Sequence, residues 1–126
     1  MLVLFGHMLA TRGIGYWFDA APGFAGISFT LWWAPTYFYP YYFLLFMAGL
    51  YHSYNGMALL LARAGLPKFH TNSTARYAVM AAGATGVMLS LLSFGGELFE
   101  IHDPRDNNYA RAYAELAQID LAAPVE

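Results

Sequence analysis

The residue best placed for chemistry in this sequence is His52, because it lies in the middle of a long apolar run. The run extends from Tyr41 to Ala64 and reads YYFLLFMAGLYHSYNGMALLLARA. About 20 apolar helical residues cross the roughly 30 Å hydrocarbon core of a bilayer, so this run predicts a transmembrane helix. An ionisable side chain at that depth is costly unless another group engages it. His52 is therefore a candidate functional residue.

Small residues surround His52 on its predicted helical face. Gly49, His52, Ser53 and Gly56 occupy positions i, i+3, i+4 and i+7, and this spacing places them on one side of a helix. A glycine one turn away in each direction leaves a flat recess beside the imidazole, and the edge of a porphyrin fits such a recess. Two alternatives stay open, namely a hydrogen bond to a neighbouring helix and a role in proton relay or quinone contact.

A second histidine, His7, lies in the apolar N-terminal run MLVLFGHMLATR. Neutral imidazole is a suitable axial ligand for haem iron, and two imidazoles give a six-coordinate electron carrier. Haem propionates need cations near a membrane face. Arg63, three turns after His52, and Arg12, at the end of the first run, are candidates for this role. Both arginines also suit a simpler role as interfacial residues that set the topology.

The composition is typical of an integral membrane protein. The 126 residues are 59% hydrophobic and 11% charged, whereas a soluble domain carries about a quarter charged residues. The absence of cysteine excludes disulfides, thiolate metal sites, iron–sulfur ligation and a cysteine-attached haem within this chain. A net charge of −2 gives no sign of nucleic-acid binding. The predicted spans lack carboxylates, which argues against a proton-pumping chain of acids.

The predicted fold is all-α, an integral membrane helical bundle subunit with two full transmembrane helices and a short N-terminal membrane segment. The helices are expected at residues 41–64 and 74–94, and the short segment at residues 1–12. Residues 13–40 are rich in Gly, Pro and aromatics, which predicts an interfacial loop with a short helix over 25–33. Gly and Pro in residues 65–73 predict the turn between the two spans.

Residues 1–96 are thus expected to form a membrane domain, and residues 97–126 a polar tail outside the membrane. Within the tail, apolar residues recur at i, i+3, i+4 and i+7, which predicts a short amphipathic helix that docks on a neighbour or on the membrane surface. These residues are Tyr109, Ala112, Tyr113 and Leu116.

The other two histidines and the second span predict no chemistry. His70 lies in the polar turn and His102 in the acidic tail, where surface histidines are ordinary. The span 74–94 carries small residues mostly on one side, and such residues let membrane helices pack closely. They are Ala75, Ala82, Gly83, Gly86, Ser90 and Ser93.

The charge distribution predicts the orientation. Arg63, Lys68 and Arg76 lie in or beside the turn between the spans, while the tail carries seven of the eight acidic residues. By the positive-inside rule, the 65–73 turn faces the cytoplasm or matrix, and the tail faces the outer side. The expected location is a bacterial cytoplasmic or mitochondrial inner membrane, which the chain crosses more than once.

Two motifs resemble a known family. The segment YHSYNGMALLLARAG is similar to the fourth helix of the cytochrome b membrane anchor of succinate dehydrogenase and fumarate reductase (complex II), where an aromatic residue precedes His–x–x–Asn–Gly. Upstream, LFGHMLATR resembles the third helix of the five-helix, two-haem form, where x–x–x–Thr–Arg follows the histidine. The resemblance covers residues 2–96 and corresponds to the C-terminal three helices of that form.

This resemblance implies a function and a set of ligands. His52 would bind the haem b nearer the cytoplasmic side, and His7 the haem b nearer the outer side. The chain would anchor flavoprotein and iron–sulfur subunits and pass electrons between them and quinone, while dicarboxylate chemistry stays in those partners. A quinone pocket lined by Tyr51, Ser53 and Tyr54 is a further expectation.

The sequence departs from the family pattern because it lacks the first two helices, which supply the other haem ligands. Three explanations stay open: another subunit supplies these helices, the chain continues upstream, or the haems have been lost. The main alternative function is a cofactor-free structural or accessory transmembrane subunit of a respiratory or photosynthetic complex. A small transporter component is disfavoured, because the spans are few and carry no carboxylate.

Overall fold

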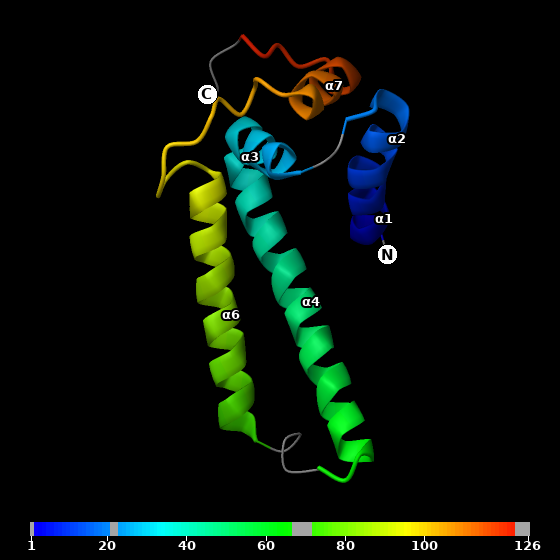
Figure 1. Cartoon of the computed structure of the whole chain (residues 1–126), viewed down its shortest axis with the longest axis vertical. Coiled ribbons are helices and arrows are strands. Elements are labelled where there is room, and N and C mark those ends of the chain that lie inside the picture. Colours follow the sequence, from blue (N-terminus) through cyan, green and yellow to red (C-terminus); the bar gives the residue numbers. More distant parts are fainter. Residues whose placement is uncertain (1, 21–22, 67–71, 123–126) are drawn as a thin grey trace. The chain divides into compact units, whose positions relative to one another are not determined.

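A computed structural model describes residues 2–20, 23–66 and 72–122, and within these ranges the chain forms helices and turns without strands (Figure 1). The all-α fold class predicted from the sequence is thereby confirmed. The elements in chain order are α1 (Leu2–Met8), the π-helix η1 (Leu9–Gly13), α2 (Ile14–Phe18), α3 (Phe24–Trp33), α4 (Pro35–Arg63), α6 (Ser73–Phe94) and α7 (Asn108–Ala117).

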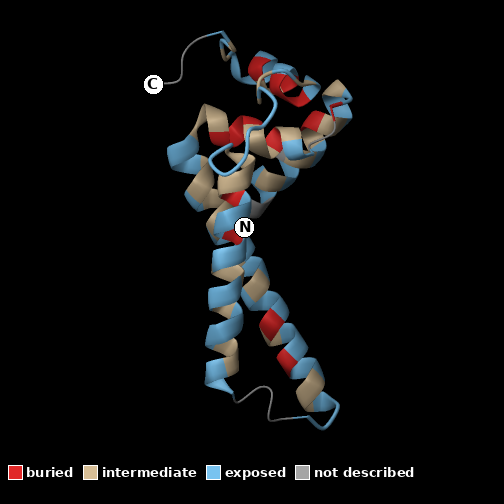
Figure 2. Cartoon of the chain, turned by 60° about the vertical axis from the view of Figure 1, so that its left-hand side comes forward, coloured by how far each residue is buried: buried red, intermediate tan, exposed pale blue. Residues whose placement is uncertain are grey.

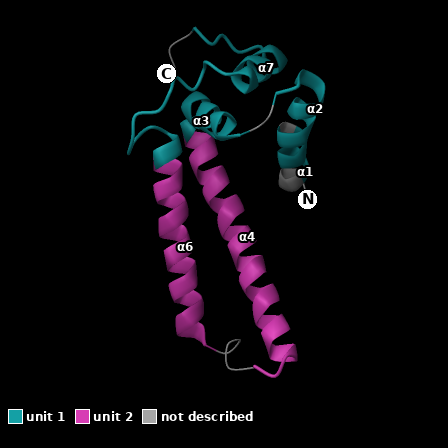
Figure 3. Ribbon diagram, viewed as in Figure 1, with its two compact units in different colours: residues 1–35, 93–126 teal, residues 36–92 magenta. Residues whose placement is uncertain are grey.

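The chain divides into two compact units (Figure 3). Unit 1 contains residues 1–35 and 93–126, and unit 2 contains residues 36–92. The N-terminal helices therefore group with the tail rather than with the two long helices. The boundary predicted at residue 96 is of another kind, because it divides a membrane part from an extramembrane part. The division into compact units does not test it, and it stays a prediction.

The N-terminal helical run is longer than expected. Helices α1, η1 and α2 follow one another without a break from residue 2 to Phe18, and Asp19 ends the run in the left-handed region at φ 50°. The predicted segment stopped at residue 12, so the next six residues are helical rather than loop. The reason is tertiary. Ile14 is only 2% exposed, and packing of its face stabilises a turn that its glycine-rich neighbours alone do not favour.

Aromatic side chains form the core of unit 1. Phe29 of α3 is fully buried, and the ring of Tyr113 from α7 meets it edge-on with centroids 5.8 Å apart. Tyr113 also packs on Trp33, at 5.3 Å between ring centroids. Helix α7 contacts both α2 and α3. The predicted tail helix is therefore confirmed, and within unit 1 it docks on the chain's own helices.

The buried surface of α7 differs from the predicted single stripe. Tyr109 and Ala112 are buried as expected, but so are Ala110 and Ala114, while Leu116 is 59% exposed. Because two helices pack on α7, its buried arc is wider than one stripe. The helix begins at a cap in which the Asn107 side-chain oxygen accepts a hydrogen bond from the amide of Ala110 at 2.8 Å.

Helices α4 and α6 match the two predicted spans and run side by side in opposite directions (Figure 1). Pro35 opens α4 six residues before the predicted start, at a position where its missing amide proton costs no helical bond. Gly65, at φ 85°, ends the helix. Leu66 donates its amide to the carbonyl of Leu61 at 2.9 Å, which closes a Schellman motif. Asn72 caps the start of α6.

A glycine allows α4 and α6 to pack closely. A Cβ atom placed on Gly83 would overlap Cδ2 of Leu50 and lie 3.7 Å from Cε1 of Phe46. Tyr54 and Ala58 follow Leu50 at intervals of four residues and are buried. These residues define the face of α4 that is directed toward α6.

Most of the surface of both long helices is uncovered, as Figure 2 shows. In the most apolar 18-residue window of each helix, only 11% of the residues are buried. Both helices are long and apolar enough to cross a membrane. The turn that was expected to face the cytoplasm falls largely at residues 67–71, outside the described residues, together with Lys68 and His70.

The aromatic core of unit 1 makes Phe29 its most sensitive position. Replacing this buried ring in Phe29→Ala should destabilise unit 1 by about 3–5 kcal/mol, because the cavity is lined by rigid rings. Amide hydrogen exchange in α7 is the direct measurement, and we expect its protection to fall. Leu116→Ala, at an exposed position on the same helix, is the control. Unchanged protection in Phe29→Ala would contradict the described core.

The packing of α4 on α6 predicts a difference between two glycines of the same helix. Gly83→Ile should destabilise the helix pair by about 1–3 kcal/mol, because the added atoms overlap Leu50. Gly86→Ile serves as the control, since a Cβ at Gly86 meets no atom within 4 Å. Reversible unfolding by sodium dodecyl sulfate in mixed micelles measures both variants, and equal effects at the two positions would argue against the described contact.

Candidate functional site

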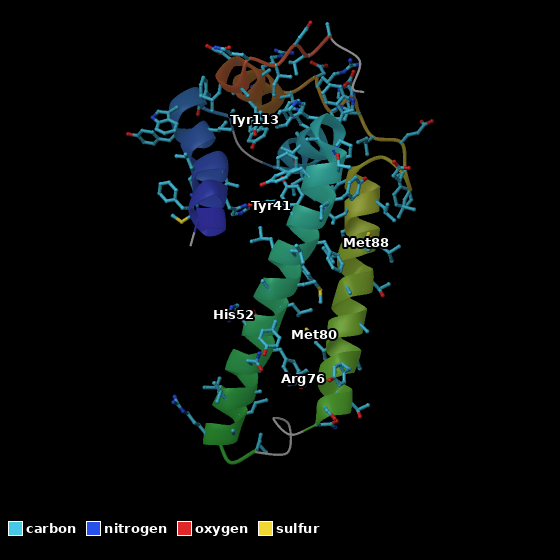
Figure 4. The ribbon with its side chains drawn as sticks, turned by 180° about the vertical axis from the view of Figure 1, so that it is seen from behind. Tyr41, His52, Arg76, Met80, Met88 and Tyr113 are labelled. Atoms are coloured by element: carbon cyan, nitrogen blue, oxygen red, sulfur yellow. The ribbon has the colours of Figure 1, made fainter. Side chains whose placement is uncertain are left out.

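His52 lies on the face of α4 opposite the one that meets α6. At 3.6 residues per turn, His52 is rotated by about 200° from Leu50, the residue in contact with Gly83. Figure 4 shows its side chain on the side of α4 away from α6, and the residue is exposed. Helix α4 thus separates a packing face from a face that carries the imidazole.

The two glycines beside His52 provide open surface. A Cβ atom built on Gly49 or Gly56 would meet no heavy atom within 4 Å. Ser53 is exposed on the same side of the helix. The recess predicted from the spacing of these residues is thus free of the chain's own side chains, and a planar group has room against the backbone. On this observation the residues present fit a haem edge.

Arg63 also belongs to this face. It follows His52 by 11 residues, which amounts to about 20° of net rotation and about 16 Å along the helix axis. Side chains in a helix point back toward its N-terminus, so the guanidinium leans toward His52. Arg63 is exposed, and no ion pair is recorded for it among the described residues. Its charge is available to an anionic group on this face.

The polar neighbours of His52 do not engage its ring. Within the described ranges, no hydrogen bond to the imidazole is recorded, and the nearest aromatic contact is with Tyr51, at 6.2 Å between ring centroids. Asn55 of the His–x–x–Asn–Gly motif donates its amide to the carbonyl of Tyr51 at 2.9 Å. The asparagine therefore bonds along its own helix, a role that the sequence analysis did not assign.

The residues expected to line a quinone pocket are not brought together by α4. Tyr54 is buried on the packing face, Ser53 is exposed near the histidine face, and Tyr51 is 52% exposed between them. Consecutive helical positions differ by about 100°, so these three side chains leave the helix in different directions. A pocket containing all three cannot be formed by this helix face alone.

His7 and Arg12 belong to unit 1, whereas His52 and Arg63 belong to unit 2. His7 is half-buried on α1, and its carbonyl accepts a hydrogen bond from the Thr11 hydroxyl at 2.8 Å. Arg12 lies in the π-helix η1 and is exposed. Single π-turns occur frequently at functional sites. The π-helix directly after His7 is a feature of this kind, and the spacing of residues in the sequence did not reveal it.

The tail of unit 1 contains a separate cluster of charged residues. Asp103 accepts hydrogen bonds from the Arg105 guanidinium, the shortest at 2.7 Å, and from the Arg105 amide at 2.9 Å. The same guanidinium lies over the ring of Trp32, 5.4 Å from its centroid. Asp106 pairs with Arg111 at 2.8 Å. The contact with Trp32 joins the tail to α3, and the two ion pairs lie within the tail, so this cluster has a structural role.

Within the described part of the chain, no group of three or more histidine or acidic side chains converges to hold a metal ion. No family model matches the chain, and neither do curated proteins or solved structures.

The charged cluster of the tail predicts a pH dependence. The side-chain hydrogen bonds from Arg105, followed by the bond from its amide, lower the pKa of Asp103 from 3.8 to about 2. A lowered carboxyl pKa stabilises the fold at pH values above that of the unfolded chain, and the contribution is lost as the pH falls toward 2. In Arg105→Gln, we expect the carboxyl pKa of Asp103 to rise toward 3.8, as measured by NMR titration.

Arg111→Gln is the control for this titration, because Arg111 pairs with Asp106 and not with Asp103. It should leave the pKa of Asp103 low. An Asp103 carboxyl that titrates near 3.8 in the unaltered chain would contradict the described pairing.

Proposed function

We propose that this chain is a membrane subunit in which His52 is an axial ligand of a b-type haem shared with a partner helix. In this role it anchors flavoprotein and iron–sulfur subunits and carries electrons between them and quinone. The observation that carries the proposal is the exposed histidine face of α4, where an imidazole lies between two open glycines in a helix of transmembrane length.

The energetics of the membrane favour a ligand role for His52. In lipid, an exposed imidazole on an apolar helix is costly unless a partner binds it. The described residues offer the ring no hydrogen bond, and α6 contacts the opposite side of α4. The partner must therefore come from outside this helix pair, and coordination to iron would satisfy one ring nitrogen.

Each residue of the face has a definite task in this proposal. His52 would hold the iron through one ring nitrogen, while a partner group accepts the proton of the other and fixes the ring orientation. Gly49 and Gly56 would let the macrocycle approach the backbone. Arg63 would pair with a propionate at the membrane surface. When bound, the haem supplies reversible one-electron transfer.

Partner helices are a necessary part of the proposal. Helix α6 exposes small residues at every fourth position, and such a series allows another membrane helix to approach closely. They are Ala78, Ala82, Gly86 and Ser90. A helix docked in the membrane beside α4 would supply the second axial ligand. The assignment to a complex II anchor, and the ligand role of His7, rest on the resemblance of the two histidine motifs.

The same small-residue series of α6 also favours the second candidate function, a structural transmembrane subunit without a cofactor. In that case His52 would donate or accept a hydrogen bond across a helix interface. The two candidates differ in whether a pigment depends on His52, and a spectrum decides between them.

The deciding experiment is a reduced-minus-oxidised spectrum of the purified complex with pyridine haemochrome quantification. We expect a b-type α-band, with haem stoichiometric to this chain. His52→Ala should remove that haem while the chain stays inserted in the membrane. Gly56→Leu should reduce haem content at least tenfold, because the new side chain fills the recess. A haem content unchanged in both variants would rule out ligation by His52.

A matched control shows whether the loss of haem in Gly56→Leu comes from filling the recess or from added side-chain volume in general. In Ala81→Leu, the new side chain extends from an exposed position of α6 outside the small-residue series, and haem content should stay at its original level. Equal losses in Gly56→Leu and Ala81→Leu would place the effect in the assembly with partner helices rather than in the recess.

A further inference from the structure

The N-terminal helical run of unit 1 exposes a continuous apolar stripe. Met8 and Leu9 lie three and four residues after Phe5, Arg12 lies three residues after Leu9, and Tyr16 lies four residues after Arg12; all five are exposed. This side of the run is distinct from the one that carries Ile14, which is buried in the core of unit 1. The run therefore has one face packed in the protein and one face without a cover among the described residues.

The exposed face is hollowed rather than flat. It borders an open groove of about 840 Å³, lined by the apolar stripe together with Thr11, Gly13, Gly15 and Trp17. Large side chains along it are well exposed, with Tyr16 at 89%, Phe5 at 68% and Trp17 at 62%. Contiguous apolar surface of this kind is typical of a binding or membrane-contact site.

Glycine gives the groove its shape near the π-helix. A Cβ atom on Gly13 would lie 2.9 Å from Cζ3 of Trp17, so the indole ring lies directly against the backbone at Gly13. The ring therefore lies against the residue that directly follows Arg12 in the chain. An aromatic ring with a polar edge beside a cation is the arrangement that proteins use at the boundary between headgroups and acyl chains.

A single charge lies in this groove. Arg12 is the one charged residue among those lining it, and no ion pair is recorded for its guanidinium within the described residues. A guanidinium recognises phosphate through two parallel hydrogen bonds. The groove thus combines an apolar lining suited to methylene groups with one site for an anionic oxygen group.

We infer that this groove binds an anionic phospholipid, with the headgroup phosphate on Arg12 and the adjoining acyl chain along Phe5, Met8 and Leu9. The charge complementarity of Arg12 selects an anionic headgroup, and the apolar stripe selects the attached chain. This gives Arg12 a role other than that of propionate partner, which its position at the end of the first apolar run suggests. The inference rests on the membrane location in the proposed function but not on the haem.

The test uses the full chain in lipid nanodiscs and the fluorescence of Trp17. Quenching by brominated phosphatidylglycerol is compared with quenching by brominated phosphatidylcholine, and the Trp17 signal is obtained by subtraction of Trp17→Phe. We expect the anionic lipid to quench Trp17 at least twofold more strongly. Arg12→Gln should abolish that excess, whereas Arg12→Lys should retain part of it.

Arg111→Gln is the matched control, because this exposed arginine of α7 is already paired with Asp106. It should keep the excess quenching by phosphatidylglycerol. Equal quenching by both lipids in the unaltered chain, or an excess that persists in Arg12→Gln, would overturn the inference. Quenching by neither lipid would overturn the membrane location as well. Selective quenching in a complex without haem would overturn the haem proposal alone.

Discussion

The exposed apolar surface of the two long helices is the constraint on which the rest of this structure depends, because it has to be shielded from water. Leu44, Leu59 and Leu60 of α4 are each more than half exposed, and in water each would forgo a little over half of the about 1.5–3 kcal/mol that full burial of a leucine contributes. Lipid or partner helices would remove that penalty, and in lipid no hydrophobic force would then hold α4 to α6. Close approach must do so instead, which is the role of Gly83 beneath Leu50.

The same constraint determines what His52 requires of its surroundings. An apolar environment such as lipid favours the exposed leucines but is costly for an imidazole. In lipid, the leucines would need only acyl chains around them, whereas His52 would need a polar or metal partner. Because α6 contacts the opposite side of α4, it does not supply that partner. Arg63 lies in the last turn of α4, where its long side chain would reach a headgroup region if the helix crosses a bilayer. The histidine face thus carries an imidazole near its middle and a cation at its end.

Unit 1 is stabilised by different means. Its core consists of rings from α3 and α7, with Phe29 and Tyr113 in edge contact, and Arg105 joins the Asp103 turn to the ring of Trp32. Exposed ion pairs contribute little individually, so the aromatic contacts decide the stability of this unit. Burial of Ile14 orients the N-terminal run and leaves the Arg12 side of it uncovered. One packed face thereby determines where an apolar ligand has access.

The sequence by itself determined the all-α fold class, the two long apolar helices and the tail helix. Hydrophobic run length, composition and four-residue spacing are local properties, and they already place Gly49, His52 and Gly56 on one face. Only the tertiary structure decided which face of α4 meets α6, that the N-terminal run continues to Phe18, and that α7 docks on α2 and α3. Each of these depends on contacts between residues far apart in the chain, such as Leu50 with Gly83, and the energy of such contacts is absent from any local pattern.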